Sequence, residues 1–310
     1  MSHFFTYAIL TATVSAAFAL ATPFLLAALG ETVGQRSGVI NLGVDGIMLL
    51  SAFATYFTAL KTGNLLYAIL AGMGVGAVMG VVTAFVSVTL KAEQGISGIG
   101  VYLFGLGFSD LLFIKLVGTP LPISELPPIN IPLLDRIPAV GGMLFKQTIL
   151  VYLAFVLVPV ATFVLNRTTF GLKIRAAGEN PAAADSMGVN ITRIRWSAVL
   201  IGCTMAGLAG AALLLYDGIF MENLTQSEGF IAVALVYFGA WRPLGVMGGS
   251  LLYGLAIAVV LEWKSLGIIP LSASDLAATV PAVITILALL TVARRFRQPA
   301  VLGKPYERGG

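Results

Sequence analysis

The strongest constraint on this chain is its series of apolar segments, each long enough to cross a lipid bilayer. Residues 7–30 contain no Lys, Arg, Asp or Glu and would form about 36 Å of α-helix, more than the roughly 30 Å of a bilayer core. Comparable segments follow at 38–60, 65–90, 96–117, 147–165, 196–216, 244–261 and 277–293. Only 10% of the residues are charged, against about 25% in a soluble domain. The sequence therefore predicts an all-α polytopic membrane protein, a bundle of about eight to nine transmembrane helices with some broken or short helices, forming one domain over residues 1–310.

Residues 230–261 do not fit a single crossing. They are apolar except at Trp241-Arg242-Pro243, which makes them too long for one span and too short for two complete ones. We expect a short segment at 230–240 and a full helix from 244, because proline interrupts a helix and arginine does not remain in lipid. The short segment either crosses the membrane inside the bundle or forms half of a re-entrant pair.

The distribution of Lys and Arg predicts the orientation in the membrane, because cytoplasmic connections carry an excess of both. With a cytoplasmic C-terminus and nine crossings, the two most basic regions, a loop at 166–195 and a tail at 294–310, lie on the cytoplasmic side. The loop from Asp217 to Glu228 has no basic residue and is expected on the outer face. Five of the 18 Lys and Arg then fall outside the cytoplasmic segments, namely Lys61, Lys115, Arg136, Lys146 and Lys264.

Small residues recur at four-residue spacing in several segments. This spacing places them on one helix face, where they allow two helices to approach closely within a bilayer. The sequence therefore predicts close helix pairs along Gly72-Gly76-Gly80, Gly202-Ala206-Gly210 and Gly245-Gly249.

One predicted span contains an unusual polar motif, Gly38-Val-Ile-Asn41-Leu-Gly43-Val-Asp45-Gly46. Glycines weaken a helix by about 1 kcal/mol each relative to alanine, and an ionised Asp near the middle of a span costs about 2.5 to 3.5 kcal/mol. Both effects favour an interrupted helix whose free backbone groups face protein or a polar path, as in transporters. Alternatively, Asn41 and Asp45 cap a helix that begins near Gly46.

A second motif lies in the basic loop and has the signals of a complete short helix. Asn180 is a good N-cap, Pro181 suits the first helical position, and Gly188 can end the helix in the left-handed conformation. A two-turn helix is not stable alone in water. We expect its apolar face, Ala183, Ala184 and Met187, to bind a cytoplasmic partner protein, with a solvated basic loop as the alternative.

Two further polar residues lie in predicted spans, Asp110 and Tyr237. Asp110 is expected near the outer end of its span, where snorkelling or pairing with Lys115 accounts for it without a function. Tyr237 either packs in the bundle or stacks on a flat substrate. With Asn41, Asp45 and Gly46, these two residues form the candidate substrate pathway.

The composition excludes several kinds of chemistry. With one Cys and one His, no disulfide framework can form, and a metal site or a His-based triad would need His3. No phosphate-binding loop of the G-x-x-x-x-G-K-[ST] type is present, since Lys61 follows Leu60 rather than glycine. Transport energy would then come from a partner or from an ion gradient. An ion-coupled transporter using Asp45 or Asp110 is the alternative of another class, whereas an enzyme would lack acid, base and nucleophile.

The chain resembles the ATP-binding-cassette (ABC) importer permeases of the branched-chain amino acid, ribose and nucleoside type. The first matching motif is their coupling-helix segment, Gly171-Leu-Lys-Ile-Arg-Ala-Ala-Gly-Glu-Asn-Pro-Ala-Ala-Ala184, followed by Gly188. The second motif is Gly38 to Gly46, near the second span. The order and separation of both motifs and the basic tail agree with this family over roughly residues 7–295.

The resemblance implies that a coupling set seats in a groove of a cytoplasmic ATPase, namely Gly178, Glu179, Asn180, Pro181, Ala184 and Gly188. It also implies a second, non-identical permease, an extracytoplasmic substrate-binding protein, and a multi-pass position in a bacterial inner membrane. ATP would be used by the partner, so this chain would carry no cofactor, metal or catalytic site, and it would not bind nucleic acid. The stretch 37–48 looks most like permeases for nucleosides and related ribosides, with branched-chain amino acid and simple-sugar permeases as alternatives.

Overall fold

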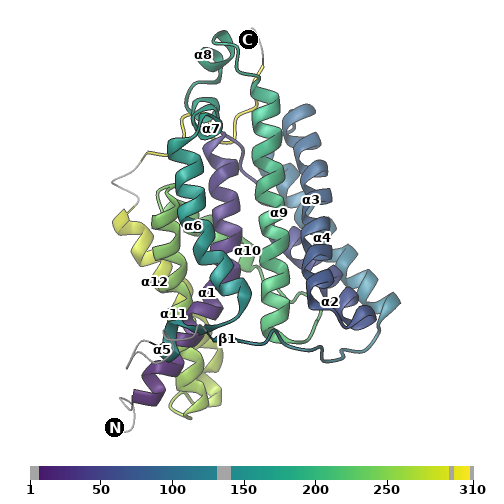
Figure 1. Cartoon of the computed structure of the whole chain (residues 1–310), viewed down its shortest axis with the longest axis vertical. Helices are drawn as coiled ribbons and strands as arrows, with labels where there is room; N and C mark the ends of the chain where they lie inside the picture. Colours follow the sequence, from purple (N-terminus) through teal and green to yellow (C-terminus); the bar gives the residue numbers. More distant parts are fainter. Residues whose placement is uncertain (1–6, 131–140, 293–296, 308–310) are drawn as a thin grey trace.

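Nine helices in the computed structural model, which describes residues 7–130, 141–292 and 297–307, correspond to the nine predicted segments (Figure 1). Among the described residues, seven helices are long and apolar enough to cross a membrane, whereas α10 and the Ser274–Leu287 part of α12 are shorter. The all-α class is confirmed. The nine are α1 (Tyr7–Arg36), α2 (Val44–Thr62), α3 (Leu65–Ala84), α4 (Gln94–Leu116), α6 (Ile149–Arg167), α9 (Ile191–Asp217), α10 (Glu228–Phe238), α11 (Pro243–Ser265) and α12 (Ser274–Val292).

Local sequence signals set several helix ends. The Asn64 side chain accepts hydrogen bonds from the N–H groups of Leu66 and Tyr67 and so begins α3. At C-terminal helix ends, Gly63 terminates α2 with a φ of 64°, and Gly218 terminates α9 with a φ of 70°. Such caps satisfy terminal backbone groups that no helix can satisfy internally.

The remaining elements lie at the two ends of the bundle. The π-helical turn η2 (Phe85–Thr89) extends α3, while α5 (Gly141–Leu144) and 3-10 turn η3 (Leu271–Ala273) are short. Two short antiparallel strands, β1 (Ile129–Asn130) and β2 (Lys146–Gln147), pair Ile129 with Gln147. At the opposite end from the N-terminus, α7 (Thr169–Glu179) and α8 (Pro181–Ser186) lie beside the C-terminal segment (Figure 1).

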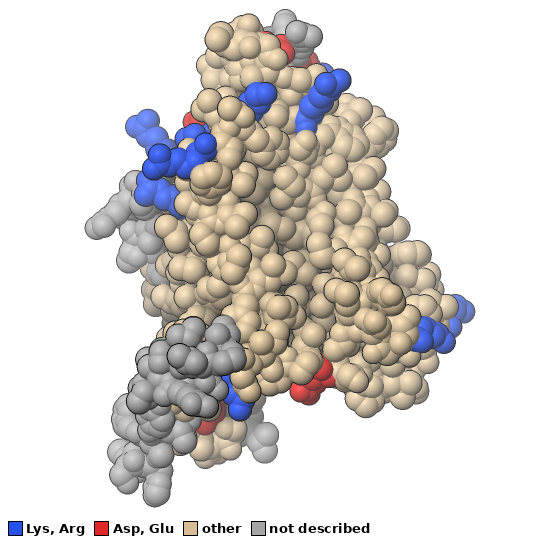
Figure 2. Space-filling view, in the orientation of Figure 1, with Lys and Arg blue, Asp and Glu red and all other residues tan. Residues whose placement is uncertain are grey.

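The two ends of the bundle differ in charge. We call the end that carries α7, α8 and residues 297–307 the basic end, and Figure 2 shows Lys and Arg gathered there over α6 and α7. The described basic residues that the helix order places at this end are Arg36, Lys91, Arg167, Lys173, Arg175, Arg193, Arg195, Arg242, Arg297 and Lys304. The prediction that the 166–195 loop and the C-terminal tail lie at the same end is confirmed for the described part of the tail.

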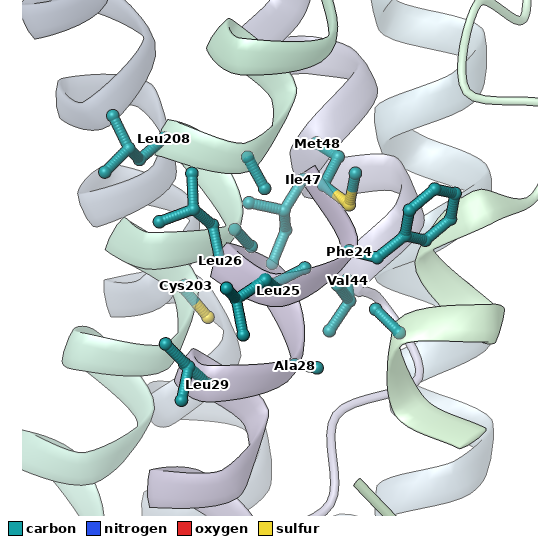
Figure 3. Packing of buried hydrophobic residues seen from close by; sticks show 14 of the residues in the cluster. Phe24, Leu25, Leu26, Ala28, Leu29, Val44, Ile47, Met48, Cys203 and Leu208 are labelled. Carbon is teal, nitrogen blue, oxygen red and sulfur yellow. The ribbon is translucent and has the colours of Figure 1, made fainter. Parts of the chain in front are cut away.

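The hydrophobic core lies where α1, α2 and α9 meet. Figure 3 shows Phe24, Leu25 and Leu26 of α1 packed with Ile47 of α2 and with Cys203 of α9. Cys203 is 1% exposed and serves as an apolar packing group in this core.

The predicted small-residue faces lie at close helix contacts. A Cβ atom placed on Gly76 of α3 would lie 2.8 Å from the Cα of Gly207 in α9, and one placed on Gly30 of α1 would lie 2.7 Å from the carbonyl oxygen of Gly202. In α11, Gly245 lies against the backbone of Gly239 at the end of α10, whereas Gly249 faces the ring of Phe238. These helices therefore pack backbone against backbone, which only small residues permit.

Candidate functional site

The predicted interruption is present between α1, which ends at Arg36, and α2, which begins at Val44. Gly38 adopts a φ of +90°, a conformation that glycine permits without a side-chain clash. The Asn41 side chain stabilises the turn, because its Oδ1 accepts the N–H of Gly43 at 2.9 Å and its Nδ2 lies 3.5 Å from the Cys203 Sγ. Asn41 is therefore a structural residue of the interruption.

Asp45 joins the start of α2 to the start of α10. Its Oδ1 accepts the N–H of Gly229 at 2.7 Å, and its Oδ2 accepts the hydroxyl of Thr225 at 3.1 Å. The side chain is fully buried. No side chain caps α2 itself, where Gly43 is the N-cap, so the suggestion that Asp45 caps its own helix is wrong. The carboxylate instead satisfies a terminal N–H of α10 and complements the positive end of that helix.

The short helix α10 covers only half of the bundle. Its 11 residues rise about 16 Å, against the roughly 30 Å of a bilayer core. It ends at the basic end, and the irregular segment 218–227 occupies the other half of the crossing. The expectation that the whole loop from Asp217 to Glu228 lies on an outer face is corrected, since Leu224 and Thr225 are buried. The loop enters the bundle because Asp45 binds both Thr225 and the first turn of α10.

Residues with strained backbones flank α10 on both sides. Asn223, Gln226 and Ser227 precede it with φ between 43° and 71°, and Ala240 and Trp241 follow it with φ of 51° and 55°. Left-handed conformations of residues other than glycine cost of order 1–3 kcal/mol and persist only where surrounding contacts impose them. Strain of this kind concentrates at functional and moving elements, which makes α10 a candidate gate.

Glu228 and Thr225 were not identified from the sequence. Glu228 begins α10, and its Oε2 atom is buried with no hydrogen-bond partner among the described residues. It therefore supplies an open acceptor beside the Asp45 junction. The sequence offers only a weak signal for Glu228 and Thr225, namely an acidic loop that has no basic residue and is followed by Gly229. In the structure, the backbone of Gly229 packs against Asp45.

The other predicted pathway residues are distributed over different places. Asp110 of α4 contacts the same irregular segment, because its Oδ1 accepts the N–H of Asn223 at 3.4 Å. The described residues contain no ion pair between Asp110 and Lys115. Gly46 packs directly against the Tyr102 backbone and leaves no space for a substrate. The structure thus brings Asp45 and Asp110 to one segment and places Gly46 in a helix contact.

Tyr237 belongs to a second polar cluster, at the basic end of α10. Its ring packs edge-on against Trp241, with centroids 4.8 Å apart. The Trp241 indole donates to Gln35 Oε1 at 2.8 Å, Gln35 donates to the buried Glu31 carboxylate at 3.2 Å, and Arg36 donates to the Trp241 carbonyl at 2.9 Å. This cluster anchors the end of α10 to α1, and sequence reasoning did not identify it.

The predicted short helix forms at the basic end as α8. Asn180 Oδ1 accepts the N–H of Ala183 at 3.0 Å, Pro181 occupies the first turn, and Gly188 has a φ of +84°. Its orientation differs in one respect from the expectation. Ala184 is 7% exposed and packs on Ala177 and Ile191 within the chain.

The surface that α8 and its C-terminal turn offer to a partner consists of Ala182, Ala183 and Met187. The first two are exposed, and Met187 is 84% exposed. Glu179 is also exposed, whereas Gly178 is buried, and its backbone lies against the end of α1. The apolar surface of α8 and its C-terminal turn is therefore exposed, and its role in coupling stays a prediction.

The C-terminal segment 297–307 is bonded to α7 and α8. The N–H of Val301 donates to the Gly178 carbonyl at 3.1 Å, and the Tyr306 hydroxyl bonds to Asp185 Oδ2 at 3.2 Å. The tail therefore fastens both α7 and α8.

The same tail is bonded to the helix interruption. The N–H of Gly303 donates to the Gly38 carbonyl at 3.1 Å. Arg195, 3% exposed, donates to the carbonyl of Ser37 at 3.2 Å and to that of Lys304 at 3.0 Å. A continuous set of contacts thus joins α8, the tail and the 37–43 interruption. The sequence analysis did not identify Arg195 or Tyr306 as part of it.

These features define a multi-pass membrane protein with a polar interruption between α1 and α2 and an exposed short helix at its basic end, an organisation that suits a transport subunit. The chain belongs to the family described as "Branched-chain amino acid transport system / permease component", whose model matches residues 13–289. It is a permease subunit of an ABC importer and not an enzyme. Permeases of this class work with an ATPase and a substrate-binding protein.

Named relatives cover most of the chain. It is 33% identical to the guanosine ABC transporter permease protein NupQ of Bacillus subtilis, over 97% of this chain and 98% of the relative. It is 35% identical to the nucleoside ABC transporter permease protein NupC of Lactococcus lactis, over 77% and 79%. It is 39% identical to the putative glucose ABC transporter permease protein TsgC13 of Haloferax volcanii, over 85% and 80%. No solved structure matches the chain.

Proposed function

We propose that this permease subunit imports nucleosides or related ribosides across a bacterial inner membrane, with its basic end and C-terminus in the cytoplasm. The observation that carries the substrate proposal is the similarity to a guanosine permease over nearly the full length of both chains. The similarity to a nucleoside permease from a second organism supports the same substrate class. The orientation follows from the positive charge of the basic end.

The junction between α2 and α10 supplies a physical basis for moving a polar solute. Nucleosides present hydroxyl and N–H donors, which need acceptors along a path through lipid. Asp45 and Glu228 place carboxylate oxygens at mid-depth, and Asp110 contacts the segment that leads there. We assign these three residues to the pathway, together with Thr225.

Coupling to ATP would run through α8. A cytoplasmic ATPase docked on Ala183 and Met187 would move α8 when it binds ATP, and the tail would carry this movement to the interruption at 37–43. The pathway, formed with a second and non-identical permease, would then switch between inward-facing and outward-facing states. This chain would need no cofactor, since ATP would be held by the partner.

A simple sugar is the second candidate substrate, favoured by the similarity to a putative glucose permease. Both candidates present a polyhydroxylated ring, so the acceptors of the junction suit either. A branched-chain amino acid has no such ring, and none of the three relatives described above is named for one.

The test is uptake by the complete transporter, reconstituted with its binding protein, ATPase and second permease. Labelled guanosine and inosine are compared with ribose, glucose and leucine, with the wild-type ATPase and with a hydrolysis-deficient one. ATP-dependent uptake of the nucleosides alone is expected. Uptake of glucose or ribose in their place would overturn the nucleoside proposal, and uptake that persists with the inactive ATPase would indicate an ion-coupled transporter.

A further inference from the structure

A cavity of about 800 Å³ opens at the basic end, away from the Asp45 junction. It lies between the end of α1, the last turns of α6, helix α7 and the turn that joins α10 to α11. Its polar wall consists of Arg36, Arg175 and Arg242 with Thr162 and Asn166. Its apolar wall includes Phe238 and Leu244. The proposed transport pathway uses none of these residues.

Three guanidinium groups from distant parts of the sequence converge on this cavity. Among the described residues, neither Arg36 nor Arg175 has a carboxylate oxygen within 4.0 Å. The Nε atom of Arg175 is buried and has no hydrogen-bond partner in the described part of the chain. Glu179, the acidic residue one turn beyond Arg175 on α7, is exposed. A buried donor in a positively charged cavity indicates an anionic ligand.

The N-terminus of α11 opens onto the same cavity. Pro243 occupies its first turn, and Leu244 and Gly245 line the space. No side chain within residues 7–130, 141–292 and 297–307 caps this 23-residue helix, so its first N–H groups have no side-chain acceptor there. The positive end of a long helix adds to the arginines, and together they favour an anion.

We propose that this cavity binds a phosphate group. Arginine matches phosphate oxygens with two parallel N–H donors, and a helix N-terminus adds backbone donors. The volume exceeds that of a bare phosphate ion and accommodates an attached glycerol or sugar. Such a phosphate comes from one of two sources, the headgroup of an anionic lipid in the adjacent leaflet or a soluble phosphate ester.

Binding here would influence coupling. Arg175 belongs to α7, which leads directly into α8, and Arg242 belongs to the turn that follows α10. A phosphate held between them would link the ATPase-docking helix to the short helix of the pathway. Occupancy would therefore change the ATP dependence of transport without contact with the transported solute.

The test measures binding to the complete transporter in nanodiscs of neutral phosphatidylcholine. The probes are inorganic phosphate, glycerol 3-phosphate and short-chain phosphatidylglycerol, with short-chain phosphatidylcholine as the neutral lipid. Saturable binding of phosphatidylglycerol alone would identify a lipid headgroup, and saturable binding of a soluble phosphate would identify the other source. Either result supports the site, and the absence of saturable binding by all anionic probes would overturn it.

Substitutions locate the binding. Arg175→Gln and Arg242→Gln are each expected to weaken binding at least tenfold, and Lys173→Gln, an exposed residue of α7 outside the cavity lining, serves as the control. Arg242 is itself exposed, so its substitution tests the site if Arg175→Gln does not fold. An equal loss in Lys173→Gln would show nonspecific charge attraction and overturn the proposal. Binding seen only without the ATPase would assign the cavity to the partner protein and would also overturn it.

Discussion

The α3–α9 contact and the α2–α10 junction show two different ways of holding helices together in this protein. The first is apolar and depends on shape, because Gly76 and Gly207 let two backbones meet with no side chain between them. The second is polar and depends on one buried carboxylate, Asp45, that bridges two helix starts. Close packing resists change, whereas a single hydrogen-bonded bridge between interrupted helices can break and re-form. We therefore expect the first contact to stay rigid and the second to move during transport.

The largest effect of a substitution is expected at the glycine contact between α3 and α9. Gly76→Val is expected to lower the free energy of unfolding by about 1–3 kcal/mol or more, because the new side chain would overlap the backbone of Gly207. We expect this loss to abolish assembly of the transporter. Gly74→Val in the same helix is the matched control, since a Cβ there meets nothing within 4 Å. Size-exclusion profiles and thermal unfolding in detergent measure both variants. Equal loss in the two variants would show that valine in α3, rather than the α9 contact, is responsible.

At the junction, we expect a loss of function with assembly preserved. Asp45→Leu removes the acceptor for Gly229 and Thr225, and each unsatisfied buried donor costs about 1–3 kcal/mol. Uptake should fall at least tenfold while the variant still binds the ATPase. Asp45→Asn keeps one acceptor oxygen and the shape, so it should retain an intermediate rate. Failure of Asp45→Leu to insert into the membrane would instead show that Asp45 is purely structural.

The comparison also explains how far the sequence predicts this structure. The helix order, the interruption near Gly38 and the glycine faces follow from hydropathy and local spacing, which are properties of neighbouring residues. The partner of Asp45 is Gly229, 184 positions away, and no local pattern identifies it. The same limit applies to Tyr306 and Asp185, which are 121 positions apart. Contacts that depend on tertiary folding, including the entry of the 218–227 loop into the bundle, lie beyond such reasoning.

A smaller effect is expected at α8, the proposed coupling helix, where a substitution should change ATP use without disturbing either helix contact. Gly188→Pro forces a φ near −65° where the chain requires +84°, so the turn after α8 would be displaced. Substrate-stimulated ATPase activity and uptake should separate, with uptake lowered several-fold more than hydrolysis. Gly267→Pro is the matched control, because it imposes a similar change on a glycine with a φ of +68° at the end of the bundle opposite α8. If the two variants behave alike, the proposed role of α8 in coupling is wrong.

The smallest effect concerns the tail that joins the coupling region to the interruption. Tyr306→Phe removes a hydroxyl that bonds to Asp185, a contact with a net contribution of about 0.5–1.5 kcal/mol. Hydrogen exchange across residues 181–188 should rise several-fold, because the tail restrains α8, while exchange in α3 and α9 stays unchanged. Lys91→Met is the control, since it removes only an ion pair between exposed side chains, worth about 0–1 kcal/mol. An equal rise in both variants would show that the tail acts through its surface charge rather than through its contact with α8, and the polar junction would then lack this mechanical link to the ATPase.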